Sequence, residues 1–170
     1  MHYVSLDIPD VLLLVPEVYK DKRGFFLETM QNSFLRSLNI PELVQHNHSR
    51  SKKGVLRGLH YQKENPQGKI VRCPNGKVFD VAVDIRRNSP YFGKYVSAIL
   101  DDKKHHQLWI PEGFAHGFIV LSEEADFCYS CTNYYHPTSE LGIYWNDKNI
   151  NINWPDIAFT KDLIISEKDK

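Results

Sequence analysis

Short runs of β-branched and aromatic residues, separated by turn signals, recur along the chain and constrain its fold more than any other feature. The runs span residues 11–15, 55–61, 69–73, 78–85, 95–100, 107–110, 117–121, 126–132 and 142–145. Turn-forming dipeptides lie between them, as in Asn65-Pro66, Ser89-Pro90 and His136-Pro137. This rhythm predicts an all-β sandwich or barrel.

Local patterns add detail to this prediction. Pro74-Asn75-Gly76 predicts a hairpin, because Asn-Gly tolerates the positive φ angles of a tight hairpin turn. Apolar residues at spacings of three and four predict one short helix over residues 31–38. The polar end, residues 166–170, is expected to fray. With no linker or internal repeat, residues 1–170 are expected to form a single domain.

Charge and composition argue against several classes of protein. Basic and acidic residues number 21 each, so no overall basic field favours nucleic acid. The longest apolar run, residues 11–15, is far shorter than the ~20 residues that cross a bilayer. No secretory signal is visible, and three cysteines do not suggest a disulfide framework. We therefore expect a soluble cytoplasmic protein that binds neither membrane nor nucleic acid.

Cys128 and Cys131 have the spacing of a zinc or redox pair, but they lie in a predicted strand. Strand residues an odd number apart point to opposite faces. No second cysteine pair or nearby histidine pair completes a metal site. The two cysteines are therefore expected to be ordinary thiols.

Residues 45–62 carry more polar side chains than a sheet core tolerates, which indicates a functional segment. Arg57 and His60 lie an odd number apart and would diverge on a regular strand. Gly58 lies between them and would permit a β-bulge. We predict that such a bulge turns both side chains toward one cavity.

A second signal is Pro111-Glu112-Gly113-Phe114-Ala115-His116, in which a tight turn delivers a histidine onto the next strand. The pattern is similar to the second motif of the cupin superfamily, whose fold is a small jelly roll. Metal-binding cupins also carry His-x-His in their first motif, where this chain has His60-Tyr61-Gln62. Two histidines fall short of the usual three ligands, so no metal is expected. Gln62 or Glu64 would be needed to complete a site.

Several longer stretches together resemble one family within that superfamily, the dTDP-4-dehydrorhamnose 3,5-epimerases. The matching stretches are residues 23–28, 55–60, 67–72, 78–84, 107–118 and 131–135. The resemblance implies a homodimeric jelly roll with N-terminal strands exchanged between subunits. It also implies a cofactor-independent enzyme that converts dTDP-4-dehydro-6-deoxy-D-glucose to dTDP-4-dehydro-L-rhamnose by inverting C3 and C5.

The resemblance also assigns roles to residues at matching positions. His60 is similar to the general base, Tyr129 to the acid on the opposite face of the sugar, and Asp162 to the carboxylate that orients the base. Lys69 and Arg57 would stabilise charge on the ketone oxygen. The remaining implied substrate contacts are Arg23, Glu28, Gln45, Asn47, His116, Glu140 and Lys161, with Tyr135 stacking on the thymine ring.

This chain also departs from the family pattern. The family usually has aspartate where this chain has His46, which receives no role. The segment between Trp154 and Asp162 is shortened, and Asp80 or Asp84 would replace Asp162 if that residue is misaligned.

The positions of Lys69 and Tyr129 fit the proton chemistry. By strand alternation Lys69 shares a face with Val71 and Cys73, so it is expected to point into the barrel. Tyr129 shares a face with Phe127 in the same way. Inverting a carbon next to a ketone requires a base, an acid and a donor for the enolate oxygen.

Three other functions stay open at this stage. A 3-epimerase acting on a related dTDP-4-keto sugar needs the same base, acid and enolate donor. A metal-dependent cupin oxidoreductase would need further ligands around His60 and His116. A sugar-nucleotide binding module would need no base or acid at all.

Overall fold

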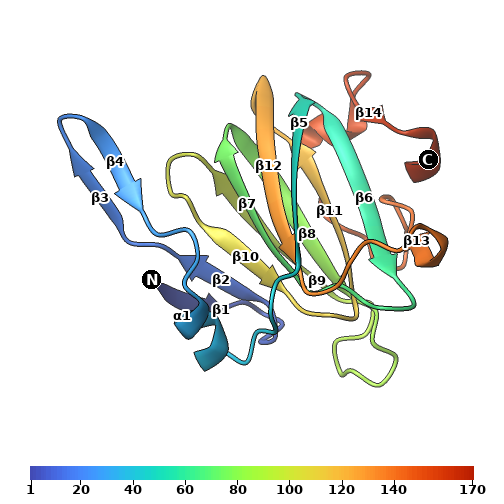
Figure 1. The fold of residues 1–170 in the computed structure, drawn as a ribbon. Helices are drawn as coiled ribbons and strands as arrows, with labels where there is room; N and C mark the ends of the chain where they lie inside the picture. Colours follow the sequence, from blue (N-terminus) through green and yellow to red (C-terminus); the bar gives the residue numbers. More distant parts are fainter.

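The computed structural model describes residues 1–170 as two antiparallel β-sheets that face each other, with a separate two-stranded hairpin (Figure 1). The first sheet contains, in order, β1 (His2–Ser5), β2 (Leu12–Val15), β10 (Gln107–Ile110), β7 (Lys69–Asn75), β12 (Glu124–Cys131) and β5 (Gln45–Lys52). The second sheet contains β13 (Glu140–Gly142), β6 (Val55–Gln62), β11 (Phe114–Val120), β8 (Lys77–Asp84) and β9 (Tyr95–Asp101). This arrangement confirms the predicted all-β jelly roll.

Smaller elements lie at the edges of the two sheets. β14 (Ile164–Ile165) pairs in parallel with β6, and β3 (Val18–Asp21) pairs only with β4 (Gly24–Leu27). The predicted helix is confirmed as α1 (Asn32–Ser37). Three 3-10 turns complete the chain: η1 (Pro137–Ser139), η2 (Asp156–Phe159) and η3 (Glu167–Asp169). None of the helices has the length and apolar character needed to span a membrane.

Eight of the predicted runs coincide with strands, namely β2 and β6 through β12. The ninth, residues 142–145, overlaps β13 only at Gly142. The prediction missed β5, whose sequence is polar throughout. Its odd-numbered positions are nevertheless more buried than its even-numbered positions, so β5 alternates as a strand does with a polar inner face.

The turn after Asn75 is real, but the predicted hairpin is wrong. β7 pairs with β10 and β12, whereas β8 pairs with β11 and β9, so the turn carries the chain from one sheet to the other. Gly76 has a φ of +84°, and a Cβ there would clash with the carbonyl oxygen of Glu124. The same turn chemistry therefore serves a crossover between sheets.

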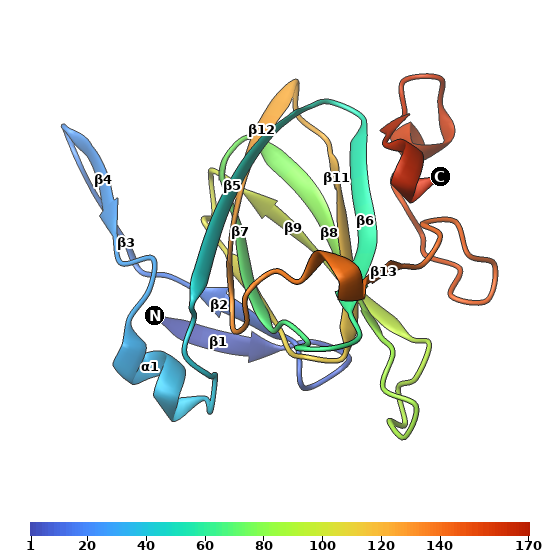
Figure 2. The same ribbon diagram turned by 45° about the vertical axis from the view of Figure 1, so that its right-hand side comes forward.

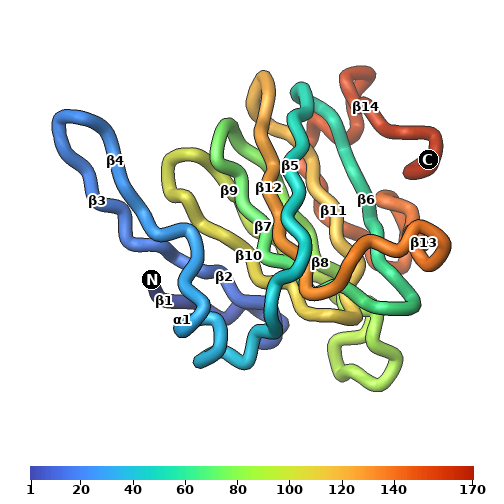
Figure 3. Tube along the Cα trace, viewed as in Figure 1, coloured from blue at the N-terminus to red at the C-terminus, as the bar shows by residue number.

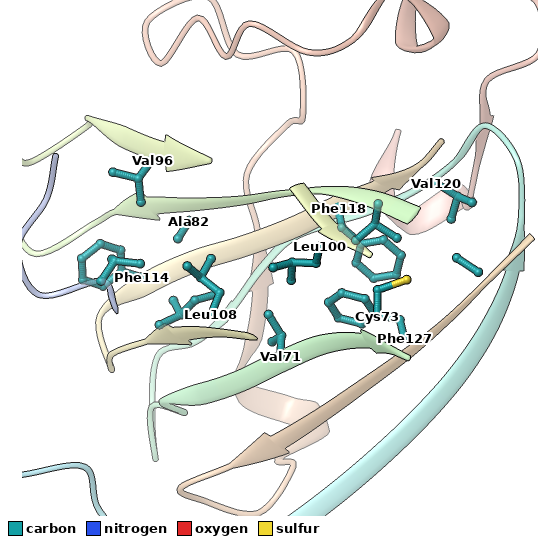
Figure 4. Close-up of a cluster of buried hydrophobic side chains, with 14 of the residues drawn as sticks. Val71, Cys73, Ala82, Val96, Leu100, Leu108, Phe114, Phe118, Val120 and Phe127 are labelled. Atoms are coloured by element: carbon teal, nitrogen blue, oxygen red, sulfur yellow. The ribbon is translucent and has the colours of Figure 1, made fainter. Parts of the chain in front are cut away.

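The main hydrophobic core lies between the sheets (Figure 4). Val71 and Cys73 point inward from β7, and Phe118 and Phe127 stack from opposite sheets with their ring centroids 4.0 Å apart. Burial of each such large apolar side chain contributes roughly 1.5–3 kcal/mol. This core holds the sheets together at one end.

Two further clusters cover the outer faces of the sheets. α1 packs Leu35 against Ile70 and Trp109 of the first sheet. Trp154 of the C-terminal segment packs with Val81 and Ile119 on the outside of the second sheet. The second sheet is therefore buried on both faces, and the tube in Figure 3 shows the C-terminal segment running behind it.

A bulge interrupts β6 where the sequence predicted one. His116 pairs with His60 and Phe118 pairs with Arg57, so Gly58 and Leu59 together face Gly117. Gly58 has a φ of +114°, and a Cβ there would lie 2.6 Å from both the Gly117 Cα and the His116 carbonyl oxygen. The position accepts only glycine, because the two backbones are in close contact.

Gly58→Ala is expected to lower the free energy of unfolding by about 2–4 kcal/mol, since it combines backbone strain with overpacking. Gly93→Ala is the matched control, because Gly93 has a φ of +76° but no atom lies within 4 Å of a Cβ added there. The control is expected to lose only about 1 kcal/mol. Urea unfolding of both variants measures the difference, and equal losses would contradict the close backbone contact.

Candidate active site

A polar cavity of about 760 Å³ lies between the two sheets, beyond the end of the hydrophobic core. Only four of its 19 lining residues are hydrophobic, which indicates a polar ligand. Phe118 and Phe127 belong to both the core and the cavity lining. The predicted site residues found in this cavity are Gln45, Asn47, Arg57, His60, Lys69, His116, Tyr129, Tyr135 and Glu140.

Strands β5, β12 and β7 form the first wall of this cavity. Tyr129 pairs with Asn47, and Lys69 pairs with Cys131, in the register of the sheet. Side chains on one face of paired strands are neighbours. The predictions that Lys69 and Tyr129 point inward are confirmed, because both side chains line the cavity.

Strands β6 and β11 form the opposite wall. His60 and His116 face each other in the register between these strands. The bulge at Gly58 places Arg57 in the same cavity as His60, which confirms the prediction made from the glycine. The cavity is thus lined by His60 and His116 from one sheet and by Lys69 and Tyr129 from the other. His46 and His48 of β5 also lie in the lining.

His60 has a carboxylate partner, but it is not the predicted one. The Nε2 atom of His60 lies 2.5 Å from Oδ1 of Asp169, a side chain only 4% exposed. Burial lowers the pKa of His60 below its usual value, although the hydrogen bond and charge of Asp169 oppose this shift. With a proton on Nε2 shared with Asp169, the Nδ1 atom is left as a proton acceptor.

The prediction that Asp162 orients His60 is wrong, as are its substitutes Asp80 and Asp84. Asp162 is exposed, and its backbone carbonyl lies against Gly54 at the far end of β6. Asp84 instead binds Arg86 and Ser89. Lys-Asp occurs twice in the C-terminal segment, at residues 161–162 and 168–169, and the second pair reaches the cavity.

The C-terminal residues are ordered against the site, contrary to the expectation of a frayed end. η3 packs on β6 and carries both Lys168 and Asp169 into the cavity lining. Lys168 Nζ donates to Glu140 Oε2 at 2.6 Å and lies in the cavity lining, whereas Lys161, the predicted substrate contact, is exposed and outside the cavity. A polar composition alone does not reveal such tethering, because the anchoring bonds reach residues far away in sequence.

Glu140 is the centre of a small polar cluster at the edge of the cavity. It accepts hydrogen bonds from Lys168 and from the Tyr135 hydroxyl, the latter at 2.9 Å, and its Oε1 lies 4.0 Å from Nδ1 of His60. Burial raises the pKa of Glu140, but the hydrogen bonds from Lys168 and Tyr135 outweigh it and leave the pKa below its usual value. Glu140 is therefore a carboxylate at neutral pH.

Burial shifts the pKa of Lys69 and of Tyr129 toward their neutral forms. It lowers the pKa of the Lys69 amine and raises the pKa of the Tyr129 phenol. No hydrogen bond contributes to either shift. Both groups therefore keep donor atoms available to a ligand.

His116 has its own buried carboxylate. Its Nε2 atom lies 2.9 Å from Oδ2 of Asp80, which is fully buried on the neighbouring strand β8. Asp80 fixes the orientation of the His116 ring as a carboxylate behind a histidine does elsewhere. The sequence suggests Asp80 as an alternative partner of His60, whereas the structure pairs it with His116.

Two predicted contacts, Arg23 and Glu28, lie away from the cavity of this chain. Arg23 is on the β3–β4 hairpin, which projects from the body of the molecule, and Glu28 follows it (Figures 1 and 2). Arg23 binds Asp21 at 2.6 Å, and the hairpin also exposes Tyr19, Phe25 and Phe26.

Cys73, Cys128 and Cys131 are free thiols, and Cys131 is buried whereas Cys128 is partly exposed. The structure contains no group of three or more His, Cys, Asp or Glu side chains arranged to hold a metal ion.

Comparison with known proteins gives one family. Residues 5–170 match the model of the family described as dTDP-4-dehydrorhamnose 3,5-epimerase. The chain is 55% identical to the dTDP-4-dehydrorhamnose 3,5-epimerase of Escherichia coli (strain K12) over 173 residues, which cover 100% of this chain and 92% of that protein.

Solved structures agree with this similarity. A dTDP-6-deoxy-D-glucose-3,5-epimerase from Legionella pneumophila Philadelphia 1, in complex with dTDP-4-keto-L-rhamnose, matches with a TM-score of 0.94 and 48% identity, covering 99% of this chain and 89% of that one. ChmJ, a 3'-monoepimerase from Streptomyces bikiniensis in complex with dTDP-quinovose, matches with a TM-score of 0.88 and 29% identity, covering 99% and 84%.

Asp169→Asn is expected to lower the pKa of His60 further, because the carboxylate that stabilises the imidazolium is lost while burial remains. An NMR titration of the His60 ring measures this shift. Asp162→Asn removes an exposed carboxylate outside the cavity and is expected to leave the titration unchanged. A larger effect of Asp162→Asn than of Asp169→Asn would contradict the observed pairing.

Proposed function

The chain belongs to the dTDP-4-dehydrorhamnose 3,5-epimerase family and is an isomerase, and on that premise we propose that it converts dTDP-4-dehydro-6-deoxy-D-glucose to dTDP-4-dehydro-L-rhamnose. The observation that carries this proposal is the pair of opposed walls, with His60 on one sheet and Tyr129 on the other, around a single polar cavity. Inversion at carbon requires loss of a proton from one face and its return to the other. A site with groups on only one wall would return the proton to the face it left.

His60 serves as the base in this proposal. Its lowered pKa keeps the imidazole neutral at neutral pH, so Nδ1 can accept a proton from the carbon next to the ketone. Asp169 holds the ring in one tautomer and stabilises the imidazolium that forms. The histidine and its carboxylate therefore act together.

Lys69 and Arg57 stabilise the negative charge that develops on the ketone oxygen. An amine donates an N–H in either protonation state, so the lowered pKa of Lys69 does not remove its role as donor. The Arg57 guanidinium stays charged at any working pH. Donors already in place stabilise an enolate without reorganisation.

Tyr129 serves as the acid on the opposite face. Burial raises the pKa of its phenol, which therefore remains protonated at neutral pH and can give its proton to the enolate carbon. Enolate formation needs only the base and the oxygen donors. Removal of the phenol is thus expected to affect inversion more than proton abstraction.

The nucleotide end of the substrate fits the polar rim of the cavity. Tyr135 is 47% exposed and offers a ring face for stacking on thymine. Lys168 provides a cation for the diphosphate, and Gln45 and Asn47 provide amide groups on the first wall. His116, held by Asp80, provides a further contact for the sugar.

We further propose that residues 1–170 form a single domain and that two copies of the chain form a homodimer. In this dimer each β3–β4 hairpin reaches the partner's cavity. Strand β5 lines the cavity and ends its sheet, so its outer edge is free to pair with another strand. The hairpin carries exposed aromatic rings and Arg23, and Glu28 follows it directly. Three free cysteines favour a reducing compartment, such as the cytoplasm.

Epimerisation at C3 alone is the alternative function, and the structural similarity to the 3'-monoepimerase ChmJ supports it. The same base, acid and oxygen donors serve either outcome. Counting which carbons exchange hydrogen separates them.

In deuterated water the wild-type protein is expected to exchange hydrogen at both C3 and C5 of the keto sugar, as followed by NMR. His60→Ala is expected to slow this exchange by about 10²- to 10⁴-fold, the usual contribution of a general base. Tyr129→Phe is expected to retain exchange but to invert the carbons slowly, because the base still acts on its own face. Tyr144→Phe changes an exposed tyrosine outside the cavity and serves as the control.

If the wild-type protein exchanges hydrogen at neither C3 nor C5, the epimerase proposal is overturned. Exchange at C3 alone would establish the 3-epimerase instead. Full inversion by Tyr129→Phe at the wild-type rate would remove Tyr129 from the role of acid.

Complementation tests the shared site. Arg23→Ala/Glu28→Ala and His60→Ala are each expected to be nearly inactive, yet refolding them together creates mixed dimers that contain one intact site. Random pairing is expected to restore about a quarter of the wild-type activity. Each variant refolded alone is the control, and no recovery in a mixture that sedimentation shows to be dimeric would contradict the reach of the hairpin.

A further inference from the structure

The guanidinium of Arg57 is held by a single neutral side chain. Its Nε and Nη2 atoms donate to Oγ of Ser51 at 3.2 and 3.1 Å. Ser51 lies on β5 of the first sheet and Arg57 on β6 of the second, so the bond joins the two sheets across the turn that contains Gly54. Ser51 is 6% exposed, whereas Arg57 is exposed and lines the cavity, so the bond anchors an exposed guanidinium to a buried hydroxyl.

Arg57 is one of four arginines without a carboxylate partner, and among these it alone donates side-chain hydrogen bonds. The other three are Arg36, Arg72 and Arg87. Arg50 and Arg86 bind carboxylates, whereas none of the salt bridges of the chain includes Arg57. A hydroxyl accepts hydrogen bonds without neutralising the positive charge, and a guanidinium has five N–H donors. The Ser51 bond therefore fixes the plane of the group and leaves its full charge and its remaining donors for a ligand.

We propose that Ser51 is a positioning residue, which aims the uncompensated charge of Arg57 at the substrate oxygen that becomes negative during epimerisation. The inference rests on the proposed function, and it extends the site from the groups that touch the substrate to a buried hydroxyl behind one of them. A carboxylate at position 51 would orient Arg57 equally well, but it would cancel the charge that the enolate requires.

The same charge acts on the opposite wall. Burial raises the pKa of Tyr129, and the charge of Arg57 partly opposes this shift. An Arg57 side chain released from Ser51 would move its charge relative to Tyr129 as well as to the substrate. The position of the guanidinium thus bears on both the enolate oxygen and the acid.

The test uses full-length protein and four variants: Ser51→Ala, Ser51→Thr, Arg57→Ala and the double variant Ser51→Ala/Arg57→Ala. Ser97→Ala, at an exposed serine on β9, is the control for replacing a strand serine. Steady-state kcat and KM with dTDP-4-dehydro-6-deoxy-D-glucose, and the pH dependence of kcat, are measured for each.

Ser51→Ala is expected to lower kcat roughly tenfold with little change in KM, because misaiming a charge weakens the transition state more than the ground state. Threonine keeps an oxygen at the γ position and suits a strand, so Ser51→Thr is expected to stay within about threefold of wild type. Because Ser51 acts through Arg57, adding Ser51→Ala to Arg57→Ala is expected to cause no further loss. The charge of Arg57 lowers the pKa of Tyr129, so an alkaline limb set by Tyr129 is expected to move upward when Ser51→Ala releases that charge.

A wild-type kcat in Ser51→Ala would overturn the inference while leaving the epimerase proposal intact. An equal further loss from Ser51→Ala in the Arg57→Ala background would also overturn it, since that result indicates a general structural role. Wild-type protein that does not act on the keto sugar would overturn the proposed function and this inference together.

Discussion

The stacking of Phe118 on Phe127 is the contact on which the rest of the structure depends. These rings join the two sheets at the boundary between a dry core and a polar cavity. On one side of them, apolar side chains from both sheets interlock. On the other side, the walls carry imidazole, amine and phenol groups that need water or a ligand. The pair therefore lets one sandwich serve as both scaffold and site.

Burial has a consistent effect on the reactive groups of this cavity. It pushes His60, Lys69 and Tyr129 toward their neutral forms, because each loses solvation of its charge. Fixed charges are instead held at the cavity by short hydrogen bonds, as in the pairing of Lys168 with Glu140. This division suits proton transfer at carbon, which begins with a neutral base and a neutral acid.

Strand alternation and glycine chemistry allowed much of this site to be predicted from sequence. The inward direction of Lys69 and Tyr129 follows from a period of two, and the bulge follows from Gly58. The carboxylate behind His60 could not be found in this way, because two Lys-Asp pairs lie near each other and local sequence does not say which reaches β6. The prediction of a hairpin at Gly76 is wrong for a similar reason. Turn residues indicate a change of chain direction, but they do not indicate which sheet the next strand joins.

The two walls of the cavity belong to different sheets, and this difference determines how the site responds to motion. Lys69 and Tyr129 lie on adjacent strands of one sheet, where backbone hydrogen bonds fix their separation, whereas His60 belongs to the other sheet. A small hinge-like opening of the sandwich would therefore lengthen the distance from His60, the proposed base, to Tyr129, the proposed acid, and would leave the spacing of Lys69 and Tyr129 unchanged. If the proposed roles hold, the relative position of the two sheets would affect the proton transfer at His60 separately from the contacts that Lys69 and Tyr129 make together.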